Sequence, residues 1–103
     1  MQLELVDSNL KFTDRFKQRI VTKFGLALDK YLTKLEPEYQ LAQLSIQKVP
    51  RFGYQLKFSM ELPFTHVYIK HESPDLMPGI VTVKDQVVRA VRKSREKLQE
   101  VRR

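Results

Sequence analysis

The chain has 103 residues, of which 42% are hydrophobic and 30% charged, which is enough apolar material for one core and excludes a disordered chain. It contains no cysteine, which excludes disulfides and zinc–thiolate sites and favours a reducing compartment. Its 19 Lys and Arg residues against 12 Asp and Glu give a net charge of +7, which favours a polyanionic partner such as nucleic acid. No basic leader precedes an apolar run, and no apolar stretch is long enough to span a membrane. We therefore expect a single cytoplasmic domain over residues 1–103, with no membrane partner.

The first third of the chain predicts a strand followed by a helix. Leu3 and Leu5 alternate with polar neighbours, which indicates a strand over residues 2–6. From Thr13 onward, apolar residues recur in steps of three and four, which predicts an amphipathic helix with this threonine as its N-cap. Because proline disfavours a helical residue before it, Pro37 ends the helix near residue 34.

The middle of the chain alternates in steps of two, as strands do. Apolar and polar residues alternate over residues 42–46 and again, more clearly, over residues 52–62. Pro50-Arg51 is short enough for a hairpin, and Pro63-Phe64 marks a second turn before a last strand around residues 67–69. These segments predict a three-stranded antiparallel meander with one apolar face.

The last part of the chain returns to helical spacing. Residues 72–75 predict a loop, after which Asp75 is a candidate N-cap and Pro78 falls in the first turn of a helix that runs to the end of the chain. Since an apolar sheet face needs a cover, both helices should lie side by side on it. The predicted fold class is α+β, a two-layer β-α-β-β-β-α arrangement with a four-stranded mixed sheet and two helices packed on one face. This arrangement is similar to a double-stranded RNA-binding domain.

Basic side chains follow both predicted helices beside their apolar stripes. If the helices pack next to each other, these rows line the groove between them and offer a surface for phosphates. The alternative is a solvated helix face that keeps the protein soluble. The rows comprise Arg15, Arg19, Lys23, Lys30 and Lys34 in the first helix and Lys84, Arg92, Arg95 and Arg102 in the last, with Arg89, Lys93 and Lys97 on the outer side of the last helix.

The sequence offers little support for catalysis or for a bound cofactor. His66 and His71 are five residues apart in a strand, which places them on opposite faces and argues against a metal pair. Only three glycines occur, too scattered for a phosphate-binding loop. We therefore expect no catalytic residue, no metal and no cofactor.

An aromatic row, Phe52, Tyr54 and Phe58, marks the clearest strand. Such rows stack RNA bases on the open sheets of some RNA-binding domains. Here the row lies on the apolar face that the helices must cover, so we interpret it as core.

Residues at both ends of the chain match the pattern of one protein family. Near the start, the family's opening strand, turn asparagine, helix-starting threonine and Lys-Phe pair are matched by Met1-Gln2-Leu3, Asn9, Thr13 and Lys23-Phe24. Near the end, its loop aspartate and basic helix are matched by Asp75, Ile80, Asp85, Arg89, Arg92-Lys93 and Lys97. Over nearly its whole length the chain thus resembles the ribosome hibernation promoting factor and protein Y family. One departure is Leu76-Met77-Pro78-Gly79, where the family often has Met-Tyr-Ala-Ala.

The resemblance implies a non-enzymatic factor that binds the small ribosomal subunit at the decoding region, overlaps the mRNA and tRNA sites, and inhibits translation under stress or in stationary phase. It implies rRNA contacts by the matched basic residues Lys23, Arg89, Arg92, Lys93 and Lys97. The chain looks most like short family members, which implies a monomer that promotes ribosome dimers together with a helper protein. Two alternatives remain open: a general double-stranded RNA-binding module, and a regulatory domain that binds an acidic protein partner.

Overall fold

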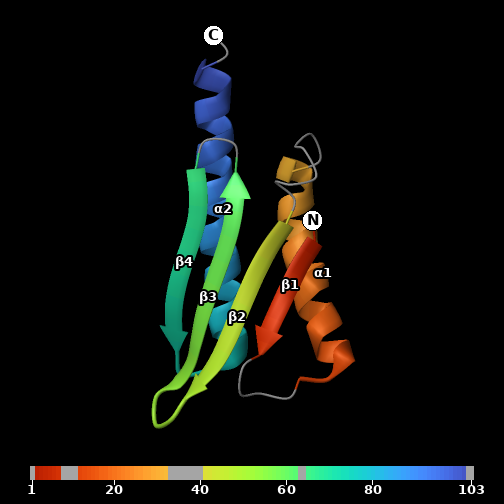
Figure 1. Ribbon diagram of the computed structural model, residues 1–103, viewed down its shortest axis with the longest axis vertical. Coiled ribbons are helices and arrows are strands. Elements are labelled where there is room, and N and C mark those ends of the chain that lie inside the picture. The colour runs from red at the N-terminus through yellow and green to blue at the C-terminus, as the bar shows by residue number, and fades with distance from the viewer. Residues whose placement is uncertain (1, 8–11, 33–40, 63–64, 102–103) are drawn as a thin grey trace.

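The computed structural model describes residues 2–7, 12–32, 41–62 and 65–101 (Figure 1). The elements along the chain are β1 (Gln2–Asp7), α1 (Asp14–Leu32), β2 (Leu41–Val49), β3 (Gly53–Leu62), β4 (Thr65–Ser73) and α2 (Leu76–Val101). The predicted β-α-β-β-β-α order is confirmed. The expected end of the first helix, near residue 34, lies outside the described residues.

The four strands form one mixed sheet in the order β1-β2-β3-β4. β1 pairs with β2 in parallel, whereas the pairs β2–β3 and β3–β4 are antiparallel. The register places Leu44, Phe58 and Ile69 side by side on one face, and Lys57 opposite Lys70 on the other. The sheet is therefore apolar on one face and polar on the other, as the alternation predicts.

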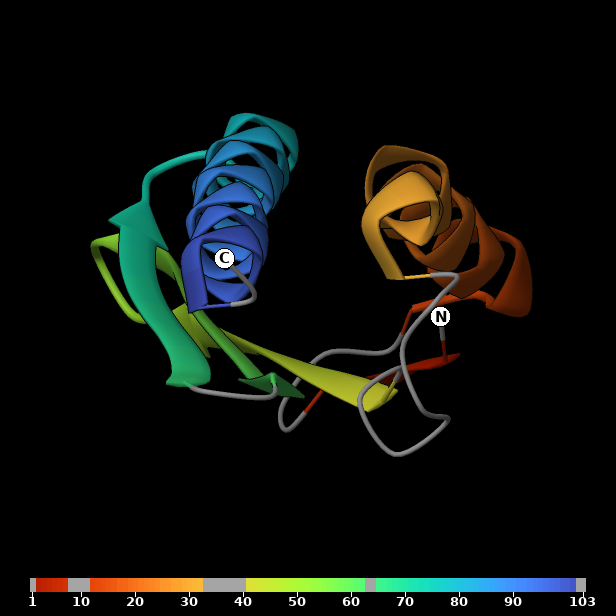
Figure 2. The same ribbon diagram turned by 90° about the horizontal axis from the view of Figure 1, so that it is seen from above.

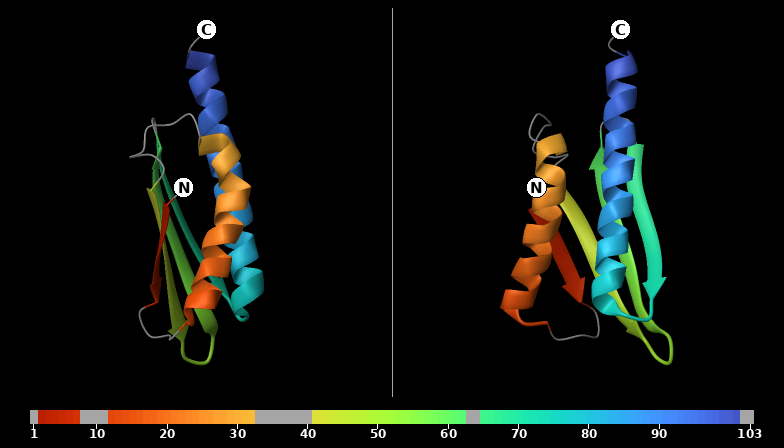
Figure 3. Two further views of the ribbon diagram at one scale, coloured as in Figure 1. Left: turned by 90° about the vertical axis from the view of Figure 1, so that its right-hand side faces the viewer. Right: turned by 180° about the vertical axis from the view of Figure 1, so that it is seen from behind.

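Both helices cover the same face of the sheet, α1 behind β1 and β2, and α2 behind β3 and β4 (Figures 1 and 2). The C-terminal part of α2 extends past the ends of the strands (Figure 3). Neither described helix is long and apolar enough to cross a membrane. The buried core lies between the two layers and consists of Ile20, Phe24, Leu28, Ala42, Leu44, Ile46, Leu56, Phe58, Met60, Leu62, Val67, Ile80, Val83, Val87 and Val91.

The first helix begins where its capping residue predicts. The amide of Phe16 donates a hydrogen bond to Oγ1 of Thr13 at 3.2 Å, and the amide of Lys17 donates to the Thr13 carbonyl at 3.0 Å. The Thr13 side chain therefore satisfies an amide of the first turn that has no partner within the helix, and its carbonyl accepts the first helical hydrogen bond.

The start of α2 differs in detail from the prediction. The loop is shorter than residues 72–75, because β4 continues to Ser73. The buried hydroxyl of Ser73 donates to the carbonyl of Asp75 at 2.7 Å and accepts from its amide at 3.3 Å, so it holds the junction between strand and helix. Asp75 directly precedes the helix, where its carbonyl accepts from the amide of Gly79 at 3.3 Å.

The turn between β2 and β3 corrects the interpretation of the aromatic row. The amide of Phe52 donates to the carbonyl of Val49 at 3.2 Å, and Arg51 between them has a positive φ of 67°. Phe52 thus belongs to the turn, where strand alternation does not apply, and its side chain is 51% exposed. Tyr54 is partly buried and Phe58 fully buried, as the core interpretation requires.

Candidate nucleic-acid interface

Positive charge is concentrated in the helical layer. The two helices carry eleven Lys and Arg residues and five Asp and Glu residues. The four strands carry three Lys and Arg residues and four Asp and Glu residues. Because both helices lie on one face of the sheet (Figure 2), the protein has a cationic layer and a nearly neutral one. A polyanion is therefore attracted to the helical side.

A hollow along α1, beside the start of α2, is lined by part of the predicted basic row. Three exposed cations of α1, Arg15, Arg19 and Lys23, line a hollow of about 420 Å³ that also includes Met77 in the first turn of α2. These three predicted residues therefore lie together on α1, beside the start of α2. The remaining lining residues are Phe16, Gln18, Ile20, Thr22 and Leu26.

A second group of cations lies on α2. Arg89, Arg92 and Lys93 are exposed and line one shallow depression together with Ala90 and Glu96. None of the predicted α2 cations lines the hollow along α1 in the described part of the chain. The helical spacing predicts Arg92 beside the groove between the helices, whereas the structure groups it with Arg89 and Lys93, the two residues predicted on the outer side.

The other predicted residues have local partners or lie outside the described part of the chain. Nζ of Lys30 lies 5.1 Å from the centroid of the Tyr31 ring, a cation–π contact. Nζ of Lys84 lies 3.7 Å from Oδ1 of Asp85, and this lysine side chain is only 24% exposed. Lys84 is therefore less available to phosphates than the two exposed groups, whereas Lys30 is exposed as they are. The structure does not describe the side chains of Arg95 and Lys97 or the residues Lys34 and Arg102.

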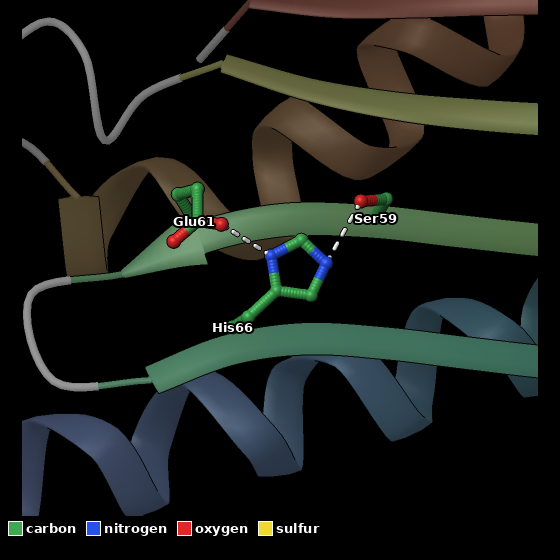
Figure 4. A network of polar contacts seen from close by, with 3 residues as sticks. All are labelled: Ser59, Glu61 and His66. Carbon is green, nitrogen blue, oxygen red and sulfur yellow. Dashed lines mark hydrogen bonds and ion pairs between the residues drawn. The ribbon is translucent and has the colours of Figure 1, made fainter.

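The open face of the sheet carries a polar network that the sequence interpretation missed (Figure 4). Nδ1 of His66 lies 2.6 Å from Oε1 of Glu61, and Nε2 lies 3.1 Å from Oγ of Ser59. Glu61 is directly opposite His66 in the β3–β4 register, so only the hairpin alignment would have indicated this pair. His71 pairs with Leu56 on the helical face, so the two histidines do lie on opposite faces.

The network has the order of a Ser-His-Glu hydrolase triad but lacks the surroundings of one. Ser59 lies in a strand that is paired on both sides, with Gln43 and Tyr68, so the nearby backbone amides are engaged in the sheet. Acyl transfer needs hydrogen-bond donors aimed at an oxyanion, and the paired backbone of β3 supplies no free amide for this. The described residues also contain no group of three or more potential metal ligands. The network therefore serves as a cross-strand link.

Two solved structures share the fold of this chain. The N-terminal domain of protein Y from Thermus thermophilus has a TM-score of 0.75 and 21% sequence identity, over 90% of this chain and 98% of that chain. A ribosomal subunit interface protein from Coxiella burnetii has a TM-score of 0.66 and 11% sequence identity, over 93% of this chain and 99% of that chain. No family model and no curated protein matches the sequence. The class of fold is thus a two-layer α+β domain with a cationic helical face. More narrowly, it is the fold of the protein Y N-terminal domain, so the sequence resemblance is confirmed at the level of the fold.

Proposed function

We propose that this protein, as one domain over residues 1–103, is a non-enzymatic cytoplasmic factor that binds the ribosome through its helical face. Its target is the rRNA of the small subunit at the decoding region, where it overlaps the mRNA and tRNA sites and inhibits translation under stress or in stationary phase. The single observation that carries the proposal is the concentration of positive charge on the helical layer of a protein Y fold.

Two cationic groups supply the attraction. The first is Arg15, Arg19 and Lys23 on α1, and the second is Arg89, Arg92 and Lys93 on α2. Each exposed cation that neutralises a phosphate releases condensed counterions, which favours binding without reading the RNA sequence. Selectivity for the small subunit then comes from the match between the positions of these cations and the phosphates of a structured RNA.

The rigid two-layer body supplies the inhibition. A core that joins both helices to the sheet allows little change of shape, so the bound protein excludes mRNA and tRNA sterically. In this proposal the protein acts as a monomer and promotes ribosome dimers with a helper protein. We include Lys97 and Arg95 of α2 among the RNA-binding residues of this proposal.

The experiment compares binding to separated ribosomal subunits. The labelled protein is titrated with purified small subunits, large subunits and an unrelated 20-base-pair RNA duplex, at one salt concentration. We expect saturable binding to small subunits at least tenfold tighter than to the other two, with displacement by mRNA and tRNA together. Equal binding to all three would contradict the proposal and favour a general double-stranded RNA-binding module. Binding that no RNA displaces would favour an acidic protein partner.

A further inference from the structure

Two exposed apolar side chains lie beside the cations of α1. Leu26 is 79% exposed and Met77 is 38% exposed, and both line the hollow along α1 together with Arg15, Arg19 and Lys23. Phosphate binding alone does not require apolar side chains at this place. Their position in the same hollow as three cations therefore points to a ligand with an apolar part as well as negative charge.

The charges around the hollow have one sign and a regular spacing. Arg15, Arg19 and Lys23 follow one another at intervals of four residues, which is about 6 Å along the helix. No carboxylate is among the described residues that line the hollow. A chain with one negative charge in every repeating unit matches such a row of cations.

We propose that this hollow binds an unpaired nucleotide of RNA. The face of the base packs against Leu26 and Met77, and the adjoining phosphates lie along Arg15, Arg19 and Lys23. This inference rests on the proposed function, because it takes the polyanion to be RNA, and it adds the kind of RNA that the site selects. In a duplex both faces of each base are covered by its neighbours, so only an unpaired base presents a face to these apolar side chains.

An acidic peptide with an apolar side chain is the competing ligand. It would also place a hydrophobic group between charges. The regular row of three cations favours RNA, since a phosphodiester chain supplies charge at every residue without a special sequence. The hollow, about 420 Å³, has the size of sites that hold one small ligand.

The test separates base packing from charge. A labelled eight-residue oligoadenylate and an abasic ribose phosphate chain of the same length carry equal charge, but only the first offers base faces. The variant Leu26→Ser, Met77→Ser removes the apolar side chains and leaves all cations. The matched control is Phe52→Ser, Tyr68→Ser, which removes two other exposed large hydrophobic side chains, on the turn and the open sheet face. Circular dichroism verifies that each variant is folded.

We expect the wild type and the control to bind oligoadenylate at least about fivefold tighter than the abasic chain, because packing of one base contributes that much or more to affinity. In the Leu26, Met77 variant this preference disappears, while binding of the abasic chain is unchanged. Equal binding of both probes by the wild type would overturn the inference. The inference would also be wrong if a glutamate- and leucine-rich peptide displaced labelled oligoadenylate at a lower concentration than unlabelled oligoadenylate does.

Binding to small subunits keeps the two proposals distinguishable. If the Leu26, Met77 variant binds small subunits as tightly as the wild type, the inference is wrong and the proposed function stands. If the wild type prefers oligoadenylate over the abasic chain but does not prefer small over large subunits, the hollow binds unpaired nucleotides and the proposed function is wrong.

Discussion

The ring of Phe24 in α1 stacks on the ring of Phe58 in β3, with centroids 5.7 Å apart and ring planes 8° apart. Both side chains are fully buried, so the pair joins the helical layer to the sheet at the centre of the core. The pair also fixes how α1 is rotated about its axis. Because successive helical residues differ by 100°, this rotation directs the adjacent Lys23 toward the hollow.

Removal of one of these rings should cost much of the stability. We expect Phe58→Ala to lower the free energy of unfolding by about 3–5 kcal/mol, the usual cost of a large cavity in a packed core. Urea denaturation measures it. Phe52→Ala, at an exposed phenylalanine six residues earlier, is the control and should change stability by less than about 0.5 kcal/mol. A small effect at both positions would contradict the described core.

Two glycines should respond to alanine in opposite directions. Gly53 has a φ of 134°, and a Cβ there would lie 2.4 Å from the carbonyl oxygen of Ser73, so Gly53→Ala should destabilise by roughly 2 kcal/mol or more. Gly25 is inside α1, and a Cβ there would have Oδ2 of Asp29 as its nearest neighbour at 3.5 Å. Gly25→Ala should therefore stabilise by about 0.5–1 kcal/mol. Thermal unfolding of both variants measures the two changes in stability. A shift of the unfolding temperature in the same direction in both variants would refute the prediction.

The N-cap of α1 should contribute measurably to stability. Thr13→Ala removes the acceptor for the Phe16 amide and should destabilise by about 1 kcal/mol. Thr22 is an exposed threonine inside the same helix, where alanine is the better helix former. Thr22→Ala should therefore be neutral or slightly stabilising in the same urea experiment. Equal losses in both variants would mean that the cap bond contributes nothing of its own.

Salt should weaken binding to the small subunit steeply. If the six exposed cations of the two groups each neutralise one phosphate, the logarithm of affinity falls with the logarithm of salt concentration at a slope on the order of −5. Arg15→Gln, Arg19→Gln should make this slope shallower by about 2, one for each lost contact. Gln18→Ala, in the same hollow but uncharged, should leave it unchanged. A wild-type slope near zero would exclude phosphate binding as the source of affinity.

The sequence predicts well those features that depend on local periodicity. The spacing of Ile20, Phe24 and Leu28 identifies the buried face of α1, and the alternation around Phe58 identifies the helical face of β3. Both patterns follow directly from the geometry of one element. Phe52 is mispredicted because it lies just before the strand, in a turn whose length the alternation does not reveal.

Features that depend on the placement of two elements are harder to predict. The pair of Glu61 and His66 follows from the exact hairpin register. The contribution of Met77 to the hollow follows from the position of the α2 start beside α1. Leu26 lies outside the apolar stripe of α1, so helical periodicity does not predict its place in the hollow. The cationic residues themselves are visible in the sequence, but their division into two groups required the packing of the helices.

The most direct test of the central claim compares charge reversal on the two faces of the protein. Arg89→Glu, Arg92→Glu changes the helical face, and Lys57→Glu, Lys70→Glu changes the open face of the sheet. Both double variants replace exposed cations and lower the net charge by the same amount. Lys57 and Lys70 are directly opposite each other in the β3–β4 register, so the second variant replaces one pair of like charges by another. We predict that, in co-sedimentation with purified small ribosomal subunits, the wild type and the sheet variant bind, while the helix variant binds at least tenfold more weakly. Equal loss in both variants, or no loss in the helix variant, would contradict binding through the helical face.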